Sequence, residues 1–116
     1  LEGQIHGGIG QAVGQALSEQ IVYDEESGQL ITGSFLDYGM PRAADSCSYD
    51  LGNNPVPTKL NPIGAKGAGE AGNVGGLGAI MNAIVDALSP LGITNIDMPA
   101  TPTKVWHAIQ EAKGKN

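Results

Sequence analysis

Residues 63–78 read IGAKGAGEAGNVGGLG, which is the densest glycine block of the chain. From its second half onward, apolar residues recur at the three- and four-residue spacing of an amphipathic helix, at Val74, Leu77, Ile80, Met81, Ile84, Val85 and Leu88. This helix should begin near Asn73, a good N-cap residue, and stop before Pro90, because proline disfavours helical backbone in the residue ahead of it. The stretch therefore predicts a glycine-rich loop that leads directly into a helix.

A second glycine-rich stretch opens the chain. Within residues 4–20 an apolar side chain returns at every fourth position, at Ile5, Ile9, Val13 and Leu17, which predicts another amphipathic helix. Four glycines interrupt it, each disfavouring the helix by up to about 1 kcal/mol relative to alanine, at Gly7, Gly8, Gly10 and Gly14. Two explanations stay open: tight packing against another element, or a ligand that lies close to the helix backbone.

The residues between these stretches have the composition of strands and loops. Residues 20–24 and 29–38 are rich in β-branched and aromatic residues and flank a polar turn at 25–28, which predicts a hairpin. Residues 39–62 contain prolines and lose all periodicity, so we expect a loop interrupted by at most one short strand near 46–51.

The last part of the chain is predicted to be a helix after a short β-like stretch at 92–97. Thr101 and Pro102 are an N-cap residue and a proline suited to the first helical position, and the helix should continue to Ala112. The polar tail at 113–116 is expected to fray. The predicted fold class is α+β, with about three helices, a hairpin and short strands in a single domain or part-domain spanning residues 1–116.

Composition excludes several classes of protein. The chain has 18 glycines among 116 residues but no G-X-Y repeat, and 41% of its residues are hydrophobic, which excludes collagen-like and disordered chains. The chain has twelve acidic and six basic residues, so it lacks the positive electrostatic field that binding of nucleic acid requires. We expect no membrane span, because no apolar run approaches roughly 18 residues. With Cys47 as the single cysteine and no signal segment, a cytoplasmic setting is expected, and the start at Leu1 suggests a processed chain or part of a longer one.

The turn at residues 67–72 satisfies the pattern G-x-G-x-x-G, which raises the question of dinucleotide binding. A Rossmann turn needs a buried strand directly before it, and here Pro62 falls where ladder hydrogen bonds should form. No ribose-binding acid follows at the required distance, and the charge of Glu70 would oppose a pyrophosphate. A small nucleotide-binding domain is therefore only a weak hypothesis.

Glu70 is the best candidate for chemistry. Glycines on both sides let a ligand approach its carboxylate closely. Two interpretations stay open: Glu70 caps the helix or lies on the surface, or it presents its carboxylate to a pocket. Lys66 could pair with Glu70 or with an anionic ligand. His6 and His107 fall on different predicted helices without a second ligand, and Cys47 has no evident base nearby. No metal ligand is predicted on this chain.

Four segments of the chain resemble, in order, the C-terminal end of molybdenum hydroxylase large subunits, the family of xanthine dehydrogenase, aldehyde oxidase and aerobic carbon monoxide dehydrogenase. They are LEGQIHGGIGQAVGQAL (1–17), TGSFLDYGMPRAAD (32–45), NPIGAKGAGEAGNVG (61–75) and ITNIDMPATPTKVWHAI (93–109). The most specific is the K-G-x-G-E-A-G loop that contains Glu70.

This resemblance implies an oxidoreductase that oxidises a small substrate, such as an aldehyde, a purine-like heterocycle or carbon monoxide, with oxygen from water. It implies a molybdenum–pterin dinucleotide as cofactor, iron–sulfur clusters and FAD on partner subunits or domains, and the remainder of the large subunit as partner. Glu70 corresponds to the general base beside the metal. The resemblance implies as cofactor neighbours Gly67, Ala68, Gly69, Gly7, Gly8, Gln4 and Gln11. The other residues that hold the cofactor belong to parts of the subunit outside this chain, so the isolated segment should be inactive.

A non-catalytic accessory module, whose glycine-rich loops clasp a partner, is the alternative hypothesis. The two differ in the molybdenum and pterin content of the native protein. Under the first hypothesis, the apolar faces of the first two predicted helices should be partly exposed in isolation, which favours self-association.

Overall fold

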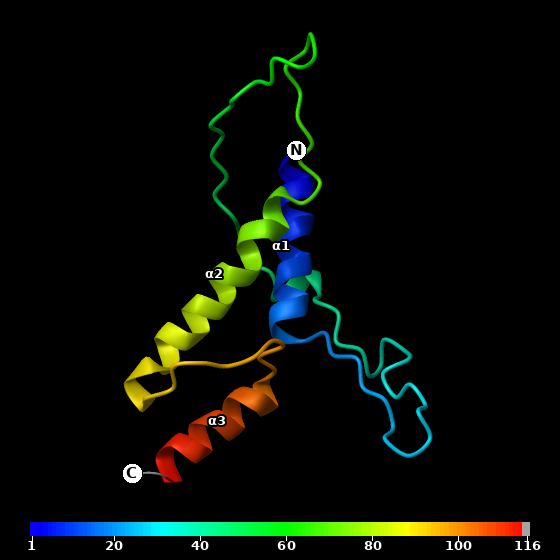
Figure 1. The fold of residues 1–116 in the computed structure, drawn as a ribbon, viewed down its shortest axis with the longest axis vertical. Helices are drawn as coiled ribbons and strands as arrows, with labels where there is room; N and C mark the ends of the chain where they lie inside the picture. Colours follow the sequence, from blue (N-terminus) through cyan, green and yellow to red (C-terminus); the bar gives the residue numbers. More distant parts are fainter. Residues whose placement is uncertain (115–116) are drawn as a thin grey trace.

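A computed structural model describes residues 1–114, in which three α-helices are joined by long irregular segments. The helices are α1 (Glu2–Leu17), α2 (Ala71–Leu88) and α3 (Pro102–Gly114), and two short 3₁₀ turns are η1 (Ala43–Asp45) and η2 (Ser89–Leu91). α1 and α2 lie side by side, and α3 lies beyond the C-terminal end of α1 (Figure 1). The molecule is extended, measuring 60 × 40 × 27 Å.

The first two helices pack through glycine. Gly8 and Gly72 are both buried, and a Cβ added to Gly8 would lie 3.0 Å from the Cα of Gly72. A Cβ on Gly72 would collide with the Ile5 carbonyl oxygen and lie 3.0 Å from the Ile9 nitrogen. Glycine is needed at both positions because the two backbones themselves are in contact. Of the two explanations for the glycines of the first helix, tight packing against another element therefore applies to Gly8.

The helix boundaries follow local hydrogen bonds. α3 begins at Pro102 as predicted, and the Lys104 N–H donates to Oγ1 of the N-cap residue Thr101 over 3.3 Å. α1 ends at Leu17 instead of Gln20, because the N–H groups of Ser18 and Glu19 both donate to the Gly14 carbonyl.

α2 begins three residues earlier than predicted, with Glu70 rather than Asn73 as N-cap residue. The Glu70 carbonyl accepts from the N–H groups of both Asn73 and Val74 at 3.0 Å, so the first helical turn already forms around Glu70. α2 ends at Leu88, ahead of Pro90 as predicted, and the chain leaves η2 through Gly92 in the left-handed conformation.

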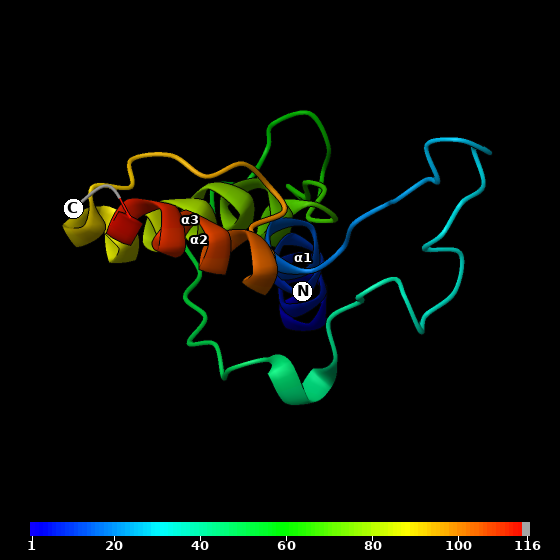
Figure 2. The same ribbon diagram turned by 90° about the horizontal axis from the view of Figure 1, so that it is seen from below.

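The predicted α+β class is not confirmed, because residues 1–114 contain helices and no strand. The expected hairpin is reduced to one antiparallel bridge between Tyr23 and Leu30, and residues 46–51 and 92–97 form no strand. Figure 2 shows why: the segment that follows α1 extends away from the helices, so no third strand or helix covers it. An isolated two-stranded ribbon is marginal in water even when its residues favour strands.

α3 continues to Gly114, so Lys113 and Gly114 belong to the helix instead of to a frayed tail. The rest of that expected tail, residues 115–116, lies outside the described residues.

The apolar core is small and consists mainly of small side chains. Its buried hydrophobic residues are Ala12, Ala16, Leu88, Ile96 and Ala100. Ala100 connects the segment before α3 to α1, because its N–H donates to the Ala16 carbonyl over 2.7 Å. Large apolar side chains stay exposed on α2 and α3, including Val74 at 82% and Trp106 at 56%. On the first two helices, Ile5, Ile9 and Val13 of α1 are half-buried and Val74 of α2 is exposed, so the expected partial exposure of their apolar faces is present. Self-association stays a prediction.

Residues Ala71–Leu91, comprising α2 and η2, are long and apolar enough to cross a membrane by length and composition. No uninterrupted apolar run of about 18 residues occurs, as expected, since polar residues such as Asn73, Asn82 and Asp86 interrupt the segment. The segment reaches the limit by its mean hydropathy, because Asp86 is its single charge. A core helix of a soluble protein passes the same test, so the segment is weak evidence for a span.

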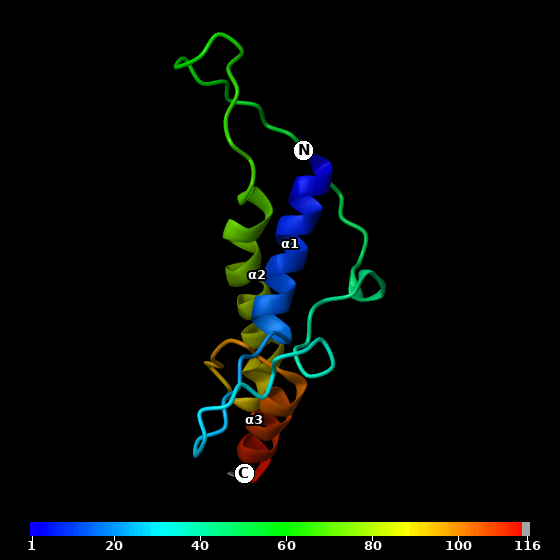
Figure 3. The same cartoon turned by 90° about the vertical axis from the view of Figure 1, so that its right-hand side faces the viewer.

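A loop is held against the end of α1 by Tyr38. Its hydroxyl donates to the Glu19 carboxylate over 2.5 Å, and a Cβ on neighbouring Gly39 would lie 3.0 Å from the Ser18 carbonyl oxygen. Figure 3 shows the chain returning past the C-terminal end of α1 before it reaches η1. The hydrogen bond to Glu19, followed by burial and by the negative charge of Glu19, raises the pKa of Tyr38 above its ordinary value.

We expect Gly72→Ala to destabilise the protein by about 1–3 kcal/mol, since the added methyl group has to separate two backbones that are in contact. Urea unfolding followed by circular dichroism measures the change. Gly78→Ala is the matched control, because Gly78 is an exposed α2 glycine with nothing within 4 Å of its Cβ position. That control should be neutral or slightly stabilising. Equal effects of the two substitutions would contradict the close backbone contact.

The raised pKa of Tyr38 predicts a pH-dependent contribution to stability. A group whose pKa is higher in the folded than in the unfolded state stabilises fully below its unfolded pKa, here about 10, and loses this effect as pH rises through the folded pKa. Tyr38→Phe should therefore lower the melting temperature at neutral pH and lose this difference above that range. Tyr23→Phe, at an exposed position outside this contact, is the control. A Tyr38→Phe difference that stays constant with pH would exclude this linkage.

Candidate functional site

The loop that contains Glu70 lies beside the first turns of α1, at the N-terminal end of α2 (Figure 3). The side-chain Nε2 of Gln4 donates a hydrogen bond to the Gly69 carbonyl over 3.2 Å. Two predicted site residues that are 65 positions apart in the sequence are therefore in contact. We call Gln4 together with residues 67–70 the glutamate loop site.

Glu70 occupies an exposed position within this site. It is the N-cap residue of α2, but its carboxylate makes no capping hydrogen bond. Its side chain and those of Ala71 and Val74 line a shallow depression together with Gly67 and Gly69. Negatively charged side chains are stabilised near helix N-termini, so the location suits a carboxylate. The residues described here leave the carboxylate open on its outer side.

The glycines of the glutamate loop site leave open space next to the backbone. A Cβ added to Gly67 or Gly69 would meet nothing within 4 Å, and neither residue has a positive φ. Ala68 is half-buried, and its carbonyl accepts from the Ala71 N–H over 3.3 Å. Nothing in the described chain requires glycine at 67 or 69, and the open space beside both residues leaves their backbone accessible to a group from outside the chain.

The predicted cofactor neighbours on α1 divide into three environments. Gln4 contacts the glutamate loop, and Gly8 is used for the contact with α2. Gly7 and Gln11 line a second depression together with Gly10, against residues 40–43 and Ser46. A Cβ at Gly7 would meet nothing within 4 Å. The structure thus unites Gln4 with residues 67–70, whereas Gly7 and Gln11 line a separate depression farther along α1.

Asn73 has a buried oxygen without a partner. Its Oδ1 is the one buried side-chain polar atom in residues 1–114 found without a hydrogen bond. It lies in the first turn of α2, where its backbone nitrogen would be 3.0 Å from a Cβ on Gly8. Sequence reasoning singled out Asn73 as an N-cap residue and gave no sign of this unsatisfied acceptor.

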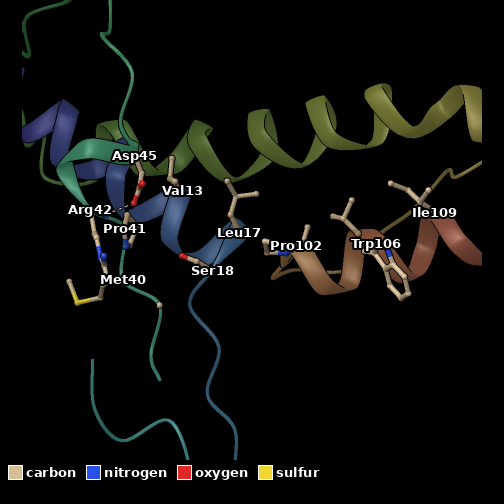
Figure 4. A pocket seen from close by; sticks show the side chains of 13 residues that line it. Val13, Leu17, Ser18, Met40, Pro41, Arg42, Asp45, Pro102, Trp106 and Ile109 are labelled. Atoms are coloured by element: carbon tan, nitrogen blue, oxygen red, sulfur yellow. Dashed lines mark hydrogen bonds between the residues drawn. The ribbon is translucent and has the colours of Figure 1, made fainter. Parts of the chain in front are cut away.

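Sequence reasoning also missed an apolar groove of about 750 Å³ at the other end of α1. Figure 4 shows Val13 and Leu17 of α1 together with Trp106 and Ile109 of α3 along this groove. Met40, Pro41 and Arg42 contribute from the loop. The sequence indicated the apolar faces of α1 and α3 that line this groove. It could not indicate that the two helices lie close together, because that depends on the path of the chain between them.

The weaker candidates show no shared chemistry. The His6 ring lies 5.3 Å from the Tyr49 ring, the His107 ring lies against Trp106, and Cys47 is exposed. Within residues 1–114, no group of three or more histidine, cysteine, aspartate or glutamate side chains is placed to hold a metal ion.

The chain is similar to known proteins over nearly its whole length. A family model described as a molybdopterin cofactor-binding domain matches residues 1–47. The carbon monoxide dehydrogenase large chain of Hydrogenophaga pseudoflava is 35% identical over 111 residues, which covers 96% of this chain and 14% of the relative. The nicotine 6-hydroxylase large subunit of Paenarthrobacter nicotinovorans is 43% identical over 110 residues, which covers 95% of this chain and 13% of the relative.

A solved structure agrees with these relatives. The crystal structure of the Cu,Mo-CO dehydrogenase in its carbon monoxide reduced state matches with a TM-score of 0.88 at 35% identity, covering 97% of this chain and 14% of that chain. The chain therefore spans only 13–14% of the length of these three proteins. Together these similarities mean that the chain belongs to the molybdenum hydroxylase family and corresponds to a part of its molybdopterin-binding large subunit.

Proposed function

We propose that this chain forms one wall of the molybdenum–pterin site of an oxidoreductase, with Glu70 as the general base. The observation that carries this proposal is the glutamate loop site itself. An exposed carboxylate is held between glycines that have open space beside them, and a side chain of α1 contacts the residue directly before it. A capping or surface glutamate would not need this arrangement.

The described residues fit a large group that approaches from outside the chain. The open backbone at Gly67 and Gly69 offers N–H and C=O groups to such a ligand without interference from side chains. Ala68 between them is the third loop neighbour in this proposal. Gly7 and Gln11 would contact the cofactor only if it also reached the depression that they line farther along α1, and Gly8 would act through its contact with α2.

The cofactor would supply the redox chemistry by accepting two electrons from the substrate, and iron–sulfur clusters and FAD on partner subunits or domains would carry them onward. Glu70 would accept the proton released when a water-derived oxygen becomes the nucleophile. The segments of the large subunit outside this chain would close the open side of Glu70. They would thereby exclude water and place the substrate against the carboxylate.

The substrate class is a small molecule whose identity depends on those other segments. The two relatives described above are named for carbon monoxide and for nicotine, although each matches almost all of this chain. We infer that this segment carries machinery common to the family. In the same proposal, α2 is a helix covered by the remainder of the large subunit in a cytoplasmic enzyme, and it does not span a membrane.

Glu70→Gln in the full-length subunit, purified within its native complex, tests the role of the base. Turnover should fall by roughly 100-fold or more, because an amide cannot accept the proton, while molybdenum content stays near that of the unmodified enzyme. The assay uses an artificial electron acceptor and whichever of carbon monoxide, an aldehyde or a purine-like heterocycle the unmodified enzyme oxidises fastest. Glu111→Gln, an exposed glutamate on α3, is the control. Unchanged turnover in Glu70→Gln would exclude Glu70 as base.

Gly67→Val tests whether the cofactor approaches the loop backbone. The chain itself has room for the side chain, so stability should change little, whereas overpacking against a ligand costs about 1–3 kcal/mol. This corresponds to roughly a 5- to 150-fold loss of affinity. Pterin and molybdenum analysis of the purified complex measures it. Gly52→Val, at an exposed loop glycine that also has nothing within 4 Å, should keep full cofactor content. A native protein without molybdenum and pterin would favour the accessory module instead.

A further inference from the structure

We propose that Gln4 is a positioning residue that fixes the glutamate loop, and through it the carboxylate of Glu70. This inference rests on the proposed function, because it concerns the geometry of the general base. Its starting point is the hydrogen bond from Gln4 Nε2 to the carbonyl oxygen of Gly69, the residue directly before Glu70. The N···O distance of 3.2 Å lies within the ordinary range.

The glutamate loop needs such a support because its backbone is otherwise weakly restrained. Glycines at 67 and 69 give it more conformational freedom than other residues would. The preceding loop has its own hydrogen bonds, with the Asn61 side chain both donating to the Ala65 carbonyl and accepting from the Ala65 N–H. Those bonds end at Ala65. Within positions 66–69, the Ala68 carbonyl accepts from the Ala71 N–H at the start of α2, and among the described residues the bond from Gln4 is the one that connects these positions to α1.

The support is rigid because the same part of α1 is locked against α2. Ile5 follows Gln4 directly, and its carbonyl oxygen is so close to Gly72 that it would collide with a Cβ added there. α1 therefore holds the chain on both sides of Glu70, at Gly69 through a side chain and at Gly72 through backbone contact. Glu70 is fixed between two points that belong to one rigid helix pair. Positioning at this level matters, since a displacement of about 1 Å can cost roughly 100-fold in rate.

This assignment changes the role expected of Gln4. Its amide nitrogen is directed at the chain itself, so its effect on the reaction would pass through Glu70. A glutamine that contacted only the cofactor would affect cofactor content and would act whether or not residue 70 is a glutamate. The two roles are distinguishable by experiment.

Gln4→Met in the full-length enzyme complex removes the donor while keeping the length of the side chain. We expect kcat to fall roughly 10- to 100-fold with little change in KM, molybdenum content or melting temperature. Hydrogen exchange in a peptide covering residues 66–72 should become faster. Gln4→Lys, which keeps a donor, should recover most of kcat. Gln15→Met, at an exposed glutamine on the same helix, should change none of these quantities.

The double variant Gln4→Met/Glu70→Gln separates positioning from direct catalysis. If Gln4 acts through Glu70, the double variant should be no slower than Glu70→Gln alone, because the two effects are not additive. A further full loss in the double variant, a loss of molybdenum in Gln4→Met, or an unchanged kcat in Gln4→Met would each overturn the positioning role. The proposed function fails separately, through full activity of Glu70→Gln.

Discussion

The contact of two backbones at Gly8 and Gly72 is the constraint on which the rest of this structure depends. It brings the first turn of α2 against α1 without any side chain between them, and the Cβ position of Gly76 comes within 2.6 Å of the Ala12 Cβ one turn farther along. Such close packing fixes the register of the two helices, because a shift would place a Cβ against backbone atoms. The glutamate loop precedes this contact directly, so its location follows from the register.

The helices could be predicted from the sequence because their signals are local. The four-residue spacing of Ile5, Ile9, Val13 and Leu17 predicts α1. The pair Thr101 and Pro102 predicts that α3 begins at Pro102, which is its first residue in the structure. The hairpin was predicted from strand-like residues on both sides of a polar turn, which is also a local signal. β-branched residues form a stable sheet only when further strands or a helix cover them, and the segment around Tyr23 has no such cover in the described chain.

The candidate site was predictable only in part, for a related reason. The glycines around Glu70 mark a carboxylate that a large group can approach, and this can be seen within a single stretch of sequence. The contact between Gln4 and Gly69 joins positions 65 residues apart and depends on the glycine register, which no local pattern encodes. The same register separates Gly7, which has open space beside it, from Gly8, which has none. Adjacent glycines of one helix thus have different surroundings, and composition alone cannot distinguish them.

The distribution of rigidity and exposure indicates what this segment contributes to a complete enzyme. It holds Glu70 between two fixed points, yet it leaves the carboxylate and much of its apolar surface uncovered. A base needs both a fixed position and a closed pocket, and the residues that close the pocket also contact the substrate. A segment that fixes the carboxylate but does not close the pocket can be shared by enzymes that act on different molecules, as the names of its relatives indicate. Substrate choice would then evolve in the closing segments without disturbing the helix pair that supports the base.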